Sequence, residues 1–194
     1  MANASNTGFR PAYKLGGGNV PVMRFPITAA GNASKNVFVG DVMIKESTYG
    51  SVLPAGAAAG TTIVGVCVAL YDSKGVPIGS PGSSTSTKYL ASATAGYADV
   101  ALALPDCIFI AQSQTSLATT EIFGTIANYY AAGDTTTAHS NHELATASAI
   151  DTDDECQILG IVNSPDNAWG LDVKVYIRFL ASHWGQVNPA NGAA

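Results

Sequence analysis

The stretch Asp172-Val173-Lys174-Val175-Tyr176-Ile177-Arg178-Phe179 alternates polar and apolar side chains along its whole length. Successive side chains of an extended strand point to opposite faces, so the apolar residues share one face and the polar residues share the other. This alternation is typical of an antiparallel strand with one face on a core and the other in water. The stretch therefore predicts an antiparallel β fold.

Further strand patterns lie along the rest of the chain. The strongest spans residues 61–71, where an apolar run predicts a buried strand with Gly65 as a bulge or a point of close backbone approach. Residues 20–27 also favour a strand, but Pro21 and Pro26 restrict it to an edge or irregular strand because proline donates no ladder hydrogen bond. Other strands are predicted at residues 37–39, 42–44, 100–104, 108–110 and 156–162.

Residues 116–130 predict the one helix of the chain. Ser116 is a suitable N-cap and a loose apolar stripe follows it, although Gly124 lowers the helical preference. Residues 131–155 are rich in Thr, Ala and Ser and predict a polar loop or insertion. The predicted fold class is mainly β: an antiparallel β-barrel or sandwich with one short helix and an extended N-terminal arm.

The length of 194 residues suits one domain or two very small ones, and the pattern along the chain favours a single domain with flanking segments. Residues 1–19 carry no periodic apolar pattern and end in a run of glycines, which predicts an extended N-terminal arm. Residues 20–185 form the predicted β-rich domain, and residues 186–194 are expected to form a flexible C-terminal tail.

Charged residues make up only 12% of the chain, against roughly 25% in a typical soluble domain. The net charge of −5 argues against a basic nucleic-acid footprint, and the longest apolar stretch, residues 63–70, is far shorter than the roughly 18 residues that span a bilayer. We therefore expect no nucleic acid and no membrane as a partner. So little charge is typical of a protein that packs against copies or other proteins.

The few charges are unevenly distributed. Residues 1–45 carry a net charge of +4 and residues 134–172 a net charge of −8, which indicates either two solvated faces or two faces for different neighbours in an assembly. The cysteines are odd in number and lie in or beside apolar runs, which favours reduced, buried thiols in a protein made in a reducing cytoplasm. They are Cys67, Cys107 and Cys156.

No motif predicts catalysis, and we expect no enzyme activity, no cofactor and no metal. His139 and His142 lie next to Glu143, but no third ligand completes a metal-binding pattern, so both are expected to be solvated loop histidines. Residues 151–155 contain four carboxylates, which favour a solvated acidic turn over a weak surface cation site.

Several short segments resemble a family of small tailed-bacteriophage virion proteins that decorate or cement the capsid. The resembling segments are Gly8-Phe9-Arg10-Pro11 with Gly17-Gly18, Val37-Phe38-Val39-Gly40-Asp41-Val42, Ile63-Val64-Gly65-Val66, Lys88-Tyr89-Leu90-Ala91-Ser92, Pro105-Asp106 with Phe109 and Gln112, Gln157-Ile158-Leu159-Gly160-Ile161-Val162, Pro165-Asp166-Asn167 and Val173-Lys174-Val175-Tyr176-Ile177-Arg178. The resemblance implies a virion structural protein without catalysis, located on the capsid exterior after synthesis in the host cytoplasm. It also implies two partners, the major capsid protein and copies of the same chain.

On this hypothesis the arm and the following edge strand contact the capsid and stabilise contacts between major capsid subunits. The expected contact residues are Phe9, Arg10, Tyr13, Lys14, Val22, Arg24 and Phe25. One alternative is another head or tail structural subunit, such as a coat-forming or head-completion protein. A second alternative is a carbohydrate-binding β-module that uses Trp169 or Trp184, although both tryptophans are first expected to pack on the core.

Overall fold

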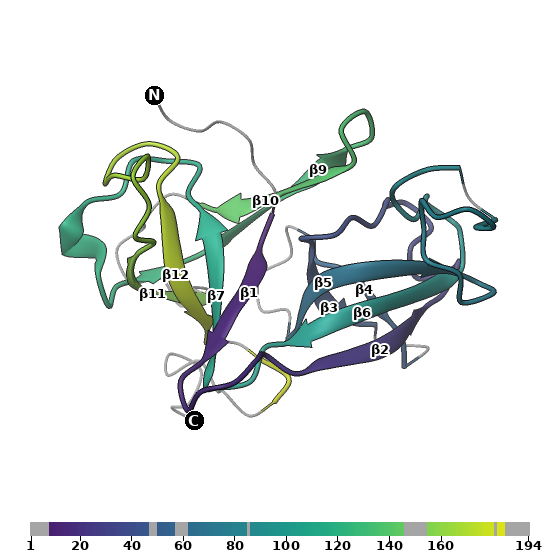
Figure 1. Cartoon of the computed structure of the whole chain (residues 1–194), viewed down its shortest axis with the longest axis horizontal. Coiled ribbons are helices and arrows are strands. Elements are labelled where there is room, and N and C mark those ends of the chain that lie inside the picture. The colour runs from purple at the N-terminus through teal and green to yellow at the C-terminus, as the bar shows by residue number, and fades with distance from the viewer. Residues whose placement is uncertain are drawn as a thin grey trace.

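The computed structural model describes residues 8–46, 50–56, 62–84, 86–145, 155–180 and 182–184. The protein is mainly β, with two five-stranded antiparallel sheets in a sandwich-like arrangement and a separate two-stranded hairpin beside them (Figure 1). The sheets are not closed into a barrel, so of the two predicted architectures the sandwich is the one observed. Within the described residues, no helix is long and apolar enough to span a membrane.

The first sheet contains the strand from which the sequence analysis began. Its strands are, in spatial order, β1 (Arg10–Lys14), β7 (Cys107–Gln112), β12 (Lys174–Phe179), β11 (Cys156–Ile161) and β8 (Thr125–Ile126). Val175, Ile177 and Phe179 are buried while the residues between them are half-buried, which confirms the predicted alternation. The apolar face of β12 therefore points into the core between the two sheets.

The second sheet is the right-hand sheet of Figure 1. Its strands are, in spatial order, β2 (Val22–Ile27), β6 (Gly96–Leu102), β5 (Ile63–Asp72), β3 (Val42–Lys45) and β4 (Val52–Pro54). Its central strand β5 is buried on both faces, because Val66 joins the core shared with the first sheet while Val64 packs in a second core with loop residues such as Val37 and Leu90. The prediction of a buried strand in residues 61–71 is confirmed.

The structure explains the predicted close approach at Gly65 and the predicted edge position of the proline-containing strand. A Cβ at Gly65 would clash with the carbonyl oxygen of Ala101, so this position is a point of close backbone approach. β2 is an edge strand, and the Leu102 N–H donates to the Pro21 carbonyl at 2.9 Å. In an antiparallel pair, every second residue directs its backbone N–H and C=O toward the neighbouring strand. The backbone groups of Val22, Arg24 and Pro26 therefore face away from β6. Because the Pro26 nitrogen faces outward, no hydrogen bond between β2 and β6 is lost at this proline.

The core between the sheets contains a cluster of aromatic rings. Phe179 lies 5.8 Å from Phe9 and 5.0 Å from Phe109, measured between ring centroids. The three cysteines are buried and free, as the sequence predicts.

Two predictions of local structure are wrong. Residues 116–130 do not form a helix: a single 3-10 turn, η1 (Thr119–Glu121), is followed by β8 and by β9 (Asn128–Asp134). Leu117 and Ile126 are both buried in the core from extended backbone, and tertiary packing decides against a helical preference already weakened by Gly124. The expected loop 131–155 also contains structure, because β9 pairs with β10 (His139–Leu144) in the antiparallel hairpin.

The expected N-terminal arm requires a correction as well. Residues 10–14 form β1 and pair with β7, so this part of the predicted arm belongs to the first sheet. The sequence does not reveal this strand, because β1 has no buried apolar pattern of its own and its partner strand β7 is distant in sequence. The predicted tail, residues 186–194, and most of the acidic run, residues 151–154, lie outside the described residues.

Candidate interaction surface

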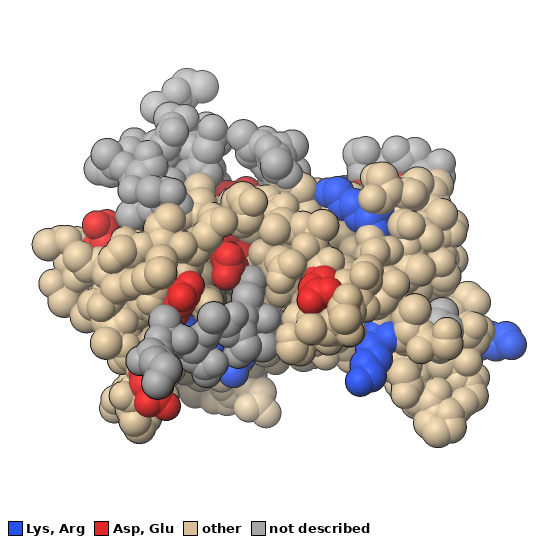
Figure 2. All heavy atoms as spheres, turned by 90° about the horizontal axis from the view of Figure 1, so that it is seen from above, with Lys and Arg blue, Asp and Glu red and all other residues tan. Residues whose placement is uncertain are grey.

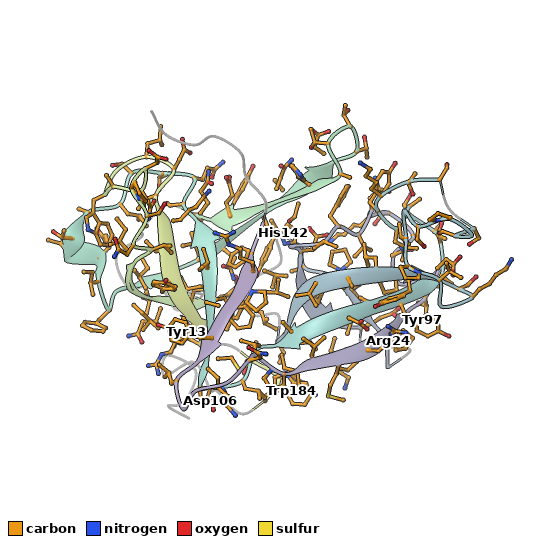
Figure 3. The ribbon with its side chains drawn as sticks, viewed as in Figure 1. Tyr13, Arg24, Tyr97, Asp106, His142 and Trp184 are labelled. Atoms are coloured by element: carbon orange, nitrogen blue, oxygen red, sulfur yellow. The ribbon has the colours of Figure 1, made fainter. Side chains whose placement is uncertain are left out.

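The expected contact residues lie on the terminal strands of the two sheets. β1 ends the order of the first sheet and β2 ends that of the second, and the two strands are joined directly by residues 15–21. Figure 3 shows Tyr13 and Arg24 at the two ends of this stretch. The structure therefore places the two groups of expected contact residues on one continuous segment at the edges of both sheets.

Four apolar side chains on this segment are exposed to solvent, with exposed fractions between 42% and 60%. They are Tyr13, Leu15, Val22 and Met23, and we call them the edge strip. Tyr13 and Val22 were expected from the sequence, whereas Leu15 and Met23 were not. Exposed apolar side chains that follow one another in this way mark contact surfaces more often than isolated ones do.

Arg24 is held by groups of its own sheet. Its Nε donates to Asp99 Oδ1 at 2.7 Å and its Nη2 to Oδ2 at 3.1 Å, and its guanidinium lies 3.7 Å from the centre of the Tyr71 ring. The Tyr71 hydroxyl donates to the same carboxylate at 2.8 Å. The Arg24 guanidinium lowers the pKa of Asp99, while the hydrogen bond to Asp99 raises the pKa of Tyr71. Arg24 is therefore already paired and oriented before any partner binds.

Lys14 is paired in the same manner, because its Nζ lies 3.2 Å from Asp106 Oδ2. Carboxylates of the same chain thus neutralise part of the positive charge of residues 1–45. Figure 2 shows a face on which uncharged residues cover most of the described surface and charged side chains are scattered among them. The apolar edge strip, rather than the basic residues, is the distinctive feature of the β1–β2 segment.

Two of the expected contact residues pack against the cores of the protein itself. Phe9 is 1% exposed and packs in the aromatic cluster of the core, so its assignment as a contact residue is wrong. Phe25 is half-buried and packs against the second core. Arg10 is exposed at the start of β1 and keeps its place among the contact residues.

A buried polar pair lies where the sequence predicts solvated histidines. His139 is exposed, but His142 is 4% exposed and its Nδ1 accepts the Val42 N–H at 3.0 Å. Its Nε2 lies 3.7 Å from Oδ1 of Asp41, which is also buried. Burial lowers the pKa of His142 and raises the pKa of Asp41. The prediction for His142 is therefore wrong, since its side chain joins the hairpin to the second sheet.

A second buried carboxylate lies at the other side of the hairpin. The Tyr130 hydroxyl donates to Glu155 Oε2 at 2.6 Å, and the Asn128 N–H lies 3.3 Å from the same oxygen. Burial raises the pKa of Tyr130 well above its ordinary value. Glu155, the last residue of the acidic run, is thus part of the interior, and the described residues contain no group of three or more side chains placed to hold a metal ion.

Both tryptophans pack on the cores, as expected. Trp169 contacts the core between the sheets, and Trp184 contacts the second core and donates its indole N–H to the Val64 carbonyl at 2.9 Å. No family model, curated protein or solved structure matches this chain.

Proposed function

We propose that the protein is a virion structural protein that decorates the outside of a tailed-phage head and stabilises contacts between major capsid subunits, without catalysis. The resemblance of the sequence to capsid decoration proteins supplies the class. The observation that supports a binding role is the edge strip: four exposed apolar side chains on the terminal strands of both sheets and on the connection between these strands.

The edge strip is well suited to repeated weak contacts. Because β1 and β2 are already paired within their sheets, binding through them requires little ordering of the backbone. Burial of apolar surface contributes about 25 cal/mol per Å², and the edge strip has only four side chains, so we expect one copy to bind modestly. Contacts repeated over a shell gain strength through avidity when neighbouring copies are linked.

The outer backbone of β2 offers a second mode of contact. The N–H groups of Val22 and Arg24 face away from β6, so an extended segment of a partner can add to this edge as a further strand. Pro26 ends the available edge, which restricts the addition to a short strand and discourages open-ended pairing of sheets.

The test uses two leucines of equal exposure. Leu15 lies in the edge strip and Leu171 lies in the turn before β12, and both are 60% exposed. Purified Leu15→Ser and Leu171→Ser proteins are mixed with heads that lack the protein, and bound protein is measured after sedimentation. We expect Leu15→Ser to reduce occupancy and Leu171→Ser to bind like the natural protein. Equal binding by both variants would remove the edge strip from the interface.

Copy number separates decoration from the alternative structural roles. Gel densitometry of purified particles compares the protein with the major capsid protein. A copy number comparable to that of the major capsid protein supports decoration, and a far smaller number, such as one ring of copies per particle, supports a head-completion or tail subunit. Absence from every particle fraction would exclude a virion role.

A further inference from the structure

A cavity of about 320 Å³ lies beside the buried Asp41–His142 pair. Its walls come from the loop before β3, from the end of β4 and from β9 and β10 of the hairpin. Lining residues include Lys35, Asp41, Ala55, Ala131 and His142. This volume is at the lower end of the range for small-molecule sites, so the cavity suits one small molecule rather than an extended chain.

Asp41 provides a buried acceptor in the wall of this cavity. Its Oδ2 accepts the Phe38 N–H at 2.8 Å, and the buried Ser140 hydroxyl also interacts with the carboxylate, whereas Oδ1 has no hydrogen-bond partner among the described residues. The side chain is 1% exposed, and an unpaired buried oxygen is rare in folded proteins. The free oxygen therefore indicates that another group completes its hydrogen bonding.

The neighbouring side chains supply donors. Because His142 Nδ1 accepts the Val42 N–H, the neutral imidazole carries its proton on Nε2, 3.7 Å from Asp41 Oδ1. Lys35 Nζ donates to the Pro54 carbonyl at 3.3 Å, and an ammonium group has three donors in all. The cavity thus presents one carboxylate oxygen and at least two donors, with apolar side chains such as Ala55 beside them.

We propose that this cavity binds a neutral hydroxyl-bearing small molecule, such as a single sugar residue. A hydroxyl group both donates and accepts, so it can donate to Asp41 Oδ1 and accept from His142 Nε2 or Lys35 Nζ. A cation is opposed by Lys35 and an anion by the Asp41 carboxylate. The carbon–hydrogen faces of a sugar ring match the apolar part of the wall. The site is separate from the edge strip and does not depend on capsid binding.

The test follows the backbone amide signals of Ala131 and Ala132 by NMR while sugars are added at millimolar concentration. Glucose, galactose and N-acetylglucosamine are the neutral probes, and glucosamine and glucuronate are their charged counterparts. We expect a saturable shift with at least one neutral sugar and weaker binding of the charged ones. Asp41→Asn places an amide donor in place of an acceptor and is expected to weaken binding about tenfold or more.

Two further variants make the result decisive. Asp166→Asn changes an exposed carboxylate in a distant turn and is expected to bind like the natural protein. Ala132→Leu extends a side chain from the face of β9 that carries Tyr130 opposite His142, so it fills the cavity and is expected to abolish binding even if Asp41→Asn is too unstable to study. Tighter binding of a charged sugar would overturn the proposed ligand class. No saturable shift with any of the five probes would show that the cavity holds only water and would overturn the proposal.

Discussion

At the scale of single residues, Phe9 shows how a side chain near the start of the chain belongs to the centre of the molecule. Its ring stacks on Phe179, which in turn contacts Phe109 edge to face. The Phe9 N–H also donates to the Gly40 carbonyl at 2.9 Å, so backbone and side chain are both held. Phe9 therefore connects β1 to both sheets.

We predict that Phe9→Ala lowers the free energy of unfolding by about 3–5 kcal/mol, the cost of removing a buried phenylalanine. Tyr13→Ala, in the adjoining strand β1, is expected to cost about 1 kcal/mol through its edge-to-face contact with Tyr176. Urea denaturation followed by circular dichroism measures both losses. A small loss of unfolding free energy in Phe9→Ala would show that Phe9 does not pack in the core and belongs to a free arm.

His142 gives the protein a dependence on pH. Since burial lowers the pKa of His142 below its usual 6.5, the unfolded chain takes up this proton at a higher pH than the folded protein. Stability is therefore expected to fall as the pH drops from about 7 towards 5. Asp41, whose pKa is raised, acts in the opposite direction and favours the folded state on further acidification, and Lys35 opposes the charging of His142.

The variant His142→Gln keeps an acceptor for the Val42 N–H but does not titrate, so it is expected to flatten this part of the stability profile. The control is His139→Gln, at the exposed start of β10. This variant is expected to keep the dependence of stability on pH. Urea midpoints at a series of pH values provide the measurement. An unchanged slope in His142→Gln would assign the pH dependence to another group.

At the scale of strands, β5 depends on a residue without a side chain. β5 passes so close to β6 at Gly65 that any Cβ would meet the Ala101 carbonyl oxygen, and both strands are central to the second sheet. The carbonyl cannot move without disturbing the ladder between the two strands. The glycine is therefore required by packing rather than by backbone dihedral angles.

Gly65→Ala is expected to destabilise the protein by at least about 1–3 kcal/mol, the usual cost of overpacking a core. Gly16→Ala provides the matched control, because nothing lies within 4 Å of a Cβ at that position. Thermal unfolding by circular dichroism is the measurement. Equal midpoints for the two variants would contradict the close approach of β5 and β6.

Strands with a continuous local pattern could be predicted from the sequence. β12 alternates, β5 has an apolar run from Ile63 to Leu70, and the prolines just before and within β2 correctly identify an edge. The helix predicted for residues 116–130 was wrong because a loose apolar stripe is compatible with both a helix and an irregular extended segment. The β-branched residues Thr119, Thr120, Ile122, Thr125 and Ile126 were a signal against the helix that could have been used.

The candidate site was predictable only where it is exposed. Tyr13 and Val22 were found, but the burial of Phe9 depends on Phe109 and Phe179, which are distant in sequence. His142 was missed because the buried face of β10 starts with two polar residues, Ser140 and His142, before Leu144. An alternation of polar and apolar residues cannot reveal a strand whose inward side chains are themselves polar.

At the scale of the whole molecule, the two sheets share one core. Residues of both sheets, such as Val66 and Phe109, belong to the same cluster, and Trp169 packs on it, whereas Trp184 packs on the second core. Because β5 contributes to both cores, loss of one core removes support from the other. We therefore expect the two sheets to unfold together.

Single-tryptophan variants test this cooperativity. Trp184→Phe leaves Trp169 as the reporter of the shared core, and Trp169→Phe leaves Trp184 as the reporter of the second core. In each variant we expect the fluorescence midpoint in urea to coincide with the midpoint from circular dichroism, as a two-state transition requires. A separate transition of Trp184 fluorescence would show that the second sheet unfolds independently.

The order of the strands also determines when each sheet can form during synthesis. All strands of the second sheet are contained in residues 22–102, so this sheet is complete long before the chain is. The first sheet begins with β1 but needs β12 next to β7, and must wait for residues 174–179. At roughly 5–20 residues per second, the face of the second sheet that will pack on the first sheet remains uncovered for several seconds after its last strand is made. The nascent protein therefore presents the surface of its future core to the cell before its final strand arrives.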